Sequence, residues 1–261
     1  MLLLATLPLA GIAQASDTGP KARVHGGEGK AERPRIALVL SGGGAKGAAH
    51  IGVLKVLEEK RIPVDIVVGT SMGSYVAGMY AMGLSAEEVE RMTLAIDWNK
   101  GYQDKVGRDE LSLRKKQQSE QYQLRTDIGV NGDSVQFPDG FFQGQSMASL
   151  LRHATSNLPA QKSFDDLPIP YRAVATDMET VTPFVLDSGS LAKAMQASMS
   201  IPGALKPVEW EGHILADGGT VNNMPVDVAK AMGADVVIAV DISAKLRTRE
   251  SLKSGLAMID Q

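Results

Sequence analysis

Two glycine-rich turns, each placed between an apolar run and a helical pattern, constrain the fold of this chain most strongly. The first turn, SGGGAKG at 41–47, follows the apolar run 36–40, and the second, GTSMG at 69–73, follows the run 64–68, which is apolar apart from Asp65. Short, mostly apolar runs are typical of strands buried on both faces of a parallel sheet. The two turns therefore predict two consecutive strand–turn–helix units.

The same alternation continues along the chain. It predicts helices at 47–59, 72–82, 85–96, 191–198 and 225–232, a strand pair at 171–175 and 182–186, a hairpin turning at 211–212, and a last buried strand at 236–240. Strands that alternate with helices predict an α/β protein, a three-layer α/β/α fold with a mostly parallel central sheet. With 261 residues, 44% of them hydrophobic, the chain can bury one large core.

The ends of the chain differ in composition from the patterned middle. Residues 1–15 are mostly apolar and end in Ala13-Gln14-Ala15, as in a secretory signal peptide, although no Lys or Arg precedes the apolar run; a buried helix is the alternative. A signal peptide implies export to the periplasm, the outer-membrane surface or the medium. Residues 16–34 form a predicted flexible linker, 35–245 the folded domain, and 246–261 a C-terminal helix that looks cut short.

Charge and cysteine content exclude several classes of function. The formal net charge is −3, so the chain lacks the basic surplus typical of proteins that bind nucleic acid. It has no cysteine, which excludes disulfides, thiolate metal sites and a cysteine nucleophile. The sequence does not indicate an oligomeric state.

The first turn can bind an anion, but its ligand is open. Residues 42–47 fit the dinucleotide-binding pattern G-x-G-x-x-G, yet the second strand ends in Val68-Gly69-Thr70-Ser71 without the acidic residue that would hold a ribose. Lys46 is followed by Gly47, so the turn is not a P-loop. Converging N–H groups of Gly42, Gly43 and Gly44 at a helix start would stabilise a phosphate or an oxyanion. A non-catalytic nucleotide- or anion-binding protein is therefore the alternative function.

The second turn has the form G-x-S-x-G between a strand and a helix, which is typical of a nucleophile elbow carrying Ser71. The chain has four histidines, and none follows a late strand, where a hydrolase base usually lies. Asp217 does end an apolar strand, directly before two glycines. A carboxylate can act as a base when burial raises its pKa or a hydrogen bond orients it. A turn-forming Asp is the alternative interpretation.

Three motifs in the order SGGGAKG, GTSMG and DGG, with flanking text such as ASMSIPGALKPV, resemble the patatin-like phospholipase family over residues 35–242. The resemblance implies that 35–245 is a patatin-like hydrolase domain that cleaves phospholipid or other acyl esters at a membrane surface, without cofactor or metal. It also suggests the passenger domain of a barrel-fused protein. It implies a nucleophile Ser71, a base Asp217, an oxyanion hole at Gly42, Gly43 and Gly44, and motif-supporting residues Lys46, Gly47, Gly69, Gly73, Gly218 and Gly219.

An apolar groove for the acyl chain is a further expectation. Its predicted lining is Met72, Met79, Met82, Phe141, Phe142 and Met147, with Phe141 and Phe142 at the mouth in contact with lipid. Simple core packing of these residues is the alternative. The charged stretch 108–125 is interpreted as a surface segment or as a flap over the site.

Overall fold

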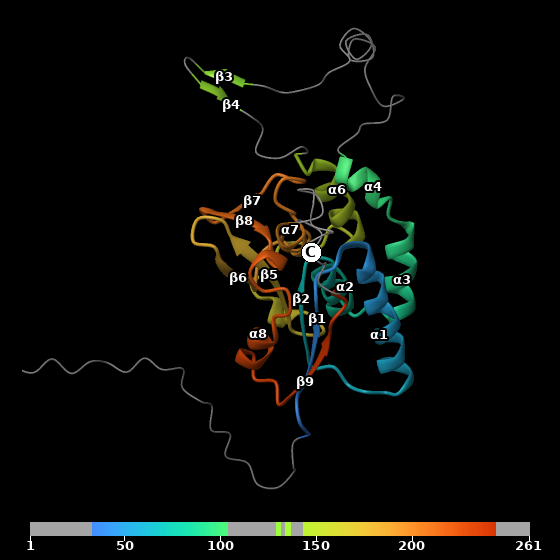
Figure 1. The fold of residues 1–261 in the computed structure, drawn as a ribbon. Helices are drawn as coiled ribbons and strands as arrows, with labels where there is room; N and C mark the ends of the chain where they lie inside the picture. Colours follow the sequence, from blue (N-terminus) through green and yellow to red (C-terminus); the bar gives the residue numbers. More distant parts are fainter. Residues whose placement is uncertain (1–32, 104–128, 132–133, 137–142, 244–261) are drawn as a thin grey trace, which may run out of the picture. The chain divides into compact units, whose positions relative to one another are not determined.

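The computed structural model of the chain describes residues 33–103, 129–131, 134–136 and 143–243 (Figure 1). The chain divides into Met1–Arg33 and Pro34–Gln261, and all the elements named below belong to the second unit. Several predictions lie outside the described residues: the signal peptide, nearly all of the linker, the C-terminal helix, the charged stretch 108–125, and Phe141 and Phe142. These stay predictions.

The main sheet is seven-stranded in the described part of the chain, with the order β7-β8-β5-β2-β1-β9 and with β6 paired to β5 (Figure 1). Strands β1, β2, β5 and β9 run parallel, whereas β6, β7 and β8 join antiparallel. A separate two-stranded hairpin pairs β3 (Gly129–Asn131) with β4 (Ser134–Gln136). The strands of the main sheet are β1 (Ile36–Leu40), β2 (Ile66–Thr70), β5 (Tyr171–Asp177), β6 (Thr182–Leu186), β7 (Val208–Trp210), β8 (His213–Asp217) and β9 (Val236–Val240).

Helices cover both faces of this sheet, which confirms the three-layer α/β/α prediction (Figure 1). Helices α1, α2, α3, α6 and α7 pack on one face, against Leu38, Leu40 and Val67, and α8 packs on the other, against Ala37 and Val39. The described helices are α1 (Ala49–Glu59), α2 (Met72–Ala81), α3 (Ala86–Ala95), α4 (Trp98–Gln103), α6 (Gln145–Ala154), α7 (Leu191–Ser198) and α8 (Val226–Ala231), with short 3₁₀ turns η1 (Gly44–Ala48), η3 (Phe164–Asp166) and η4 (Gly218–Thr220).

Three expected elements differ from the structure. Strand β2 begins at Ile66 rather than at 64, because the Asp65 carboxylate accepts the Ile36 N–H at 2.8 Å and occupies the place of a ladder bond. Helix α1 begins at Ala49, after the 3₁₀ turn η1. Strand β9 is not buried as predicted: Val236 is 43% exposed. In the described part of the chain β9 is an edge strand that pairs only with β1, so apolar composition alone misplaced it.

Candidate active site

Ser71 and Asp217 lie side by side. Ser71 follows β2 at the start of α2, Asp217 is the last residue of β8, and β5 lies between these two strands in the sheet. The Ser71 hydroxyl Oγ donates a hydrogen bond of 2.6 Å to Oδ2 of Asp217. Both side chains are buried, with exposures of 6% and 7%. A hydroxyl bonded to a buried carboxylate can be deprotonated by it, which is what a nucleophile–base pair requires.

The backbone turns sharply at Ser71. Its dihedral angles are φ 52° and ψ −125°, a sparsely populated conformation that costs about 1–3 kcal/mol for a residue with a side chain. The flanking glycines make the turn possible: a Cβ on Gly73 would collide with the Leu40 carbonyl oxygen, and a Cβ on Gly69 would collide with the Gly73 backbone. Helix α2 can therefore start directly against the end of β1 and present Ser71 above the sheet.

Asp217 is held by bonds to its side chain and its backbone. The Gly219 N–H donates to Oδ1 at 2.8 Å, and the Thr176 hydroxyl donates to the Asp217 carbonyl oxygen at 2.8 Å. Gly218, the first glycine of the DGG motif, fits where a Cβ would collide with the Val174 carbonyl oxygen. Burial raises the pKa of Asp217, and the hydrogen bonds from Ser71 and Gly219 oppose that rise in part. A carboxylate with a raised pKa is a stronger proton acceptor.

The glycine-rich loop passes directly over Ser71, and the N–H of its first glycine, Gly42, already donates hydrogen bonds within the protein. A Cβ on Gly42 would lie 3.0 Å from the Ser71 Cβ. The Gly42 N–H donates to Asn223, to Oδ1 at 3.1 Å and to the carbonyl oxygen at 3.3 Å. Without a substrate the Gly42 N–H is thus bonded to Asn223, and its role as an oxyanion donor stays a prediction. Among the described residues Gly43 and Gly44 donate no hydrogen bond from their N–H groups, so these two N–H groups are available to an oxyanion.

The other residues of the first motif support the loop. Lys46 is exposed in η1, with its charge on the surface next to the loop. Gly47 is buried, and a Cβ there would collide with the Met72 side chain. The 3₁₀ turn η1 thus packs closely on the start of α2, next to Ser71. Gly44 has φ +54°, a left-handed conformation that glycine adopts without strain.

None of the histidines in the described part of the chain is bonded to the Ser71–Asp217 pair. His50 is fully buried and donates from Nε2 to the Ser41 carbonyl oxygen at 2.8 Å; burial lowers its pKa. His213 lies 2.8 Å from Asp177, measured from Nδ1 to Oδ2. His153 is exposed on α6. These contacts of the described histidines do not reach Ser71 or Asp217.

Two residues near the site were not predicted from the sequence. Asn223 binds the glycine loop, and the one sequence feature that could have indicated it is its position shortly after the DGG turn. Tyr102, in α4, lies near enough to Asp217 that burial and the carboxylate's charge together raise its pKa to about 12. Two of the residues predicted to line an acyl-chain groove, Met79 and Met147, are instead fully buried in the core, as the alternative of simple core packing expects. Met82 is partly buried.

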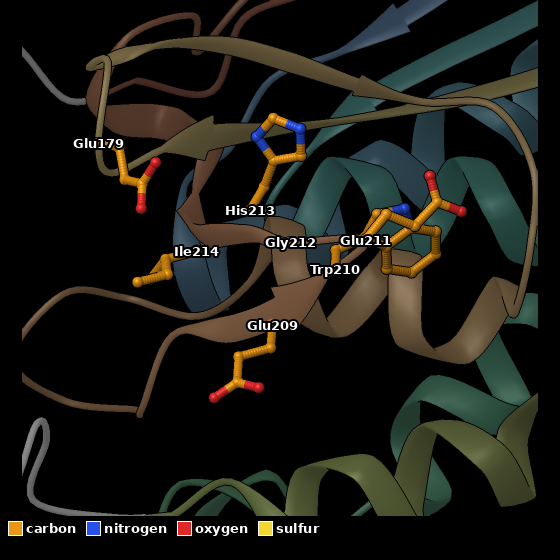
Figure 2. A pocket seen from close by; sticks show the side chains of 7 residues that line it. All are labelled: Glu179, Glu209, Trp210, Glu211, Gly212, His213 and Ile214. Carbon is orange, nitrogen blue, oxygen red and sulfur yellow. The ribbon is translucent and has the colours of Figure 1, made fainter.

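A separate pocket of about 390 Å³ lies at the β7–β8 hairpin rather than at the dyad (Figure 2). It surrounds the start of β8, four residues before Asp217, which is about 13 Å along an extended strand. Its lining includes the imidazole of His213 beside the acidic side chains Glu179, Glu209 and Glu211. The pocket therefore does not belong to the Ser71–Asp217 site.

The three-layer fold and the Ser71–Asp217 pair, with Ser71 in a G-x-S-x-G turn, define an α/β protein with the site architecture of a serine hydrolase. The family model for patatin-like phospholipase matches residues 38–230, and the chain belongs to this family.

This chain spans only a small part of the first relatives that it matches. It is 37% identical over 216 residues to the mouse patatin-like phospholipase domain-containing protein 6, covering 82% of this chain and 14% of that protein. It is 32% identical over 213 residues to the fruit-fly neuropathy target esterase sws, covering 80% of this chain and 13% of that protein. Among solved structures, VipD from Legionella pneumophila covers 74% of this chain and 47% of its own, with a TM-score of 0.46 and 18% identity.

Proposed function

We propose that this chain is a serine hydrolase that cleaves acyl ester bonds of lipids, phospholipids included, with Ser71 as nucleophile and Asp217 as base. The observation that carries the proposal is the 2.6 Å hydrogen bond from Ser71 Oγ to Asp217 Oδ2 within the strand–turn–helix elbow. Membership of the patatin-like phospholipase family supports lipid esters as the substrate class. One relative is itself named an esterase.

In the first half of the reaction Ser71 Oγ attacks the ester carbonyl carbon while its proton passes to Oδ2 of Asp217. The carbonyl oxygen becomes an oxyanion, which in this proposal the N–H groups of the glycine loop stabilise. One such donor is worth about 3 kcal/mol in other hydrolases. The tetrahedral intermediate then collapses, and the alcohol leaves with the proton from Asp217. Ser71 now carries the acyl group as an ester.

In the second half a water molecule replaces the alcohol. Asp217 accepts a proton from this water as its oxygen attacks the acyl carbon, and the same loop stabilises the second oxyanion. Collapse returns the proton to Ser71 Oγ and releases the fatty acid. The proposed reaction uses only these side chains and backbone groups.

Lipid esters reside in bilayers and micelles, so the proposal includes peripheral contact with a membrane surface. In the described part of the chain, no helix is both long and apolar enough to cross a membrane. Exposed Lys46 beside the glycine loop can attract an anionic head group toward Ser71. Export through residues 1–15 and lipid contact at Phe141 and Phe142 are further parts of this proposal.

The pH dependence of turnover follows from the pKa of Asp217. Only the charged carboxylate can accept the Ser71 proton, and burial raises this pKa above the ordinary value of 3.8. We therefore expect kcat/KM on a soluble ester to fall on acidification, with a midpoint above that ordinary value. A stopped assay across the acid range measures it. A midpoint at or below the ordinary value would mean that the base is exposed or is not Asp217.

Histidine replacements separate the dyad from a triad. His153→Ala and His213→Ala should keep most of the wild-type kcat/KM, because neither ring is bonded to Ser71 or Asp217 among the described residues. Ester hydrolysis by the purified variants is the measurement. A loss by either variant as large as that of Ser71→Ala would replace the proposed dyad with a Ser–His arrangement.

A mass-spectrometric screen of lipid products tests the proposed function and its substrate range. The wild type and Ser71→Ala are incubated with phospholipids, lysophospholipids and neutral acyl esters, and the released fatty acids identify the bond cleaved. Release by the wild type alone supports the hydrolase. No release from any ester, together with thermal stabilisation by a nucleotide, would favour the anion-binding alternative.

A further inference from the structure

The segment ASMSIPG at 197–203, which marks the family resemblance but has no part in the proposed chemistry, lies against both members of the dyad. Ser198, the last residue of α7, and Ser200 are fully buried. The backbone N–H of Ser71 donates to the Ser198 hydroxyl at 2.8 Å, and that hydroxyl donates to the Val174 carbonyl oxygen at 2.6 Å. Ser198 thus connects the nucleophile to strand β5.

The next turn of the same segment reaches the base. The Asp217 N–H donates to the Ser200 carbonyl oxygen at 2.8 Å, while Thr176 of β5 donates to the Asp217 carbonyl oxygen. Two residues of β5, Val174 and Thr176, therefore anchor the two sides of the dyad. Ser71 is bonded to a side chain of this segment, that of Ser198, whereas Asp217 is bonded to its backbone.

Ser71 needs such a partner because its conformation is unfavourable. At φ 52° and ψ −125° its N–H precedes the helix and takes no part in the hydrogen bonds of α2. Its carbonyl oxygen is satisfied by Ser74 and Tyr75, whereas its N–H points to Ser198 Oγ. A buried N–H without an acceptor is costly, so loss of the Ser198 hydroxyl would favour a rotation of the elbow away from this geometry.

We propose that Ser198 is a positioning residue that holds the strained Ser71 elbow, so that Oγ stays within hydrogen-bond distance of Asp217. This inference rests on the proposed function, since its effect on turnover acts through Ser71. Ser198 touches neither the reacting atoms nor the carboxylate. Its loss should therefore act on the rate of the chemical step and leave binding of the ester nearly unchanged.

The test compares Ser198→Ala with Thr155→Val. The Thr155 side chain is 1% exposed, and its hydroxyl donates to the Leu151 carbonyl oxygen at the end of α6, so this variant also removes a buried hydroxyl bonded to the backbone. Hydrolysis of p-nitrophenyl butyrate is measured per site titrated with a fluorophosphonate, which corrects for misfolded protein. We expect Ser198→Ala to lower kcat about 10- to 100-fold, with little change in KM, and Thr155→Val to keep the wild-type kcat.

Hydrogen–deuterium exchange of the peptide that contains Ser71 gives a readout without substrate. Faster exchange at this amide in Ser198→Ala, but not in Thr155→Val, supports the inference, because the exchanging group is the N–H that loses its acceptor. Equal kcat per titrated site in the two variants, with unchanged exchange, would overturn it.

Two further outcomes are decided in advance. If Ser198→Ala does not fold, Ser198→Cys replaces it, since a thiol of similar shape is a weak acceptor, and a kcat equal to that of Thr155→Val would again overturn the inference. If the wild type hydrolyses no ester, the proposed function fails by itself. The exchange measurement then decides whether Ser198 holds the elbow.

Discussion

Ser71→Ala should abolish ester hydrolysis, with a loss in kcat of about 10³-fold or more, because in serine hydrolases removal of the nucleophile alone costs about as much as removal of the whole catalytic set. Alanine has no Oγ to form the acyl-enzyme. Alanine keeps the Cβ of serine and therefore the same backbone preferences, so we expect the elbow to keep its conformation. Steady-state hydrolysis of a short soluble ester, set against the uncatalysed rate, measures the loss.

Folding of this variant provides the control. The substitution removes one buried hydrogen bond, the one from Oγ to Asp217, and should cost about 1–2 kcal/mol in the free energy of unfolding. A Ser71→Ala protein with near-wild-type stability and no turnover supports the assignment. Turnover within tenfold of wild type would exclude Ser71 as the nucleophile.

Asp217→Asn should be nearly as inactive, with a loss of about 10³-fold or more, because an amide cannot accept the Ser71 proton. Asparagine has almost the same shape, and its Oδ1 can still accept the Gly219 N–H. The fluorophosphonate reaction should slow in parallel with ester hydrolysis, since both need the deprotonated Ser71 Oγ. Activity close to wild type would show that another group takes the proton.

We expect the free energy of unfolding of Asp217→Asn at neutral pH to be at least as large as that of wild type. Burial raises the pKa of Asp217 in the folded state, so the folded protein favours the neutral acid, and this contribution to stability is lost as the pH rises through the raised pKa. Asparagine never carries the charge. The variant should therefore be at least as stable as wild type at neutral pH, and this advantage should shrink toward pH 3.8, the ordinary carboxyl pKa.

Denaturant unfolding of both proteins at several pH values measures this difference. A variant much less stable than wild type at neutral pH would mean that the charged carboxylate is stabilised in the fold. In that case its pKa would be lowered, not raised.

The sequence was sufficient where the determining signal was local. The apolar runs and glycine turns placed β1, α1, β2 and α2 within two residues, because a strand, a tight turn and a helix start each leave a signature in adjacent positions. The helix expected at 85–96 begins at Ala86, and Ser85 caps it in a capping box with Glu88. Asp217 was found through the DGG turn at the end of an apolar strand.

The sequence was insufficient where a group's role depends on contacts across the fold. The hydrogen bond from the Gly42 N–H to Asn223 joins residues 181 positions apart, and no local sequence pattern predicts it. The same holds for Ser198, whose hydroxyl meets Ser71 across 127 positions. The prediction that β9 is buried was wrong for a related reason, since an apolar run does not reveal which strand lies at a sheet edge.

Covalent labelling with a fluorophosphonate, followed by mass-spectrometric mapping of the modified peptide, tests the central claim most directly. The account predicts one adduct per chain, on Ser71 Oγ, absent from Ser71→Ala and formed far more slowly by Asp217→Asn. A single adduct on another residue in a protein that hydrolyses esters, or ester hydrolysis that continues after Ser71 is fully modified, would contradict the Ser71–Asp217 dyad.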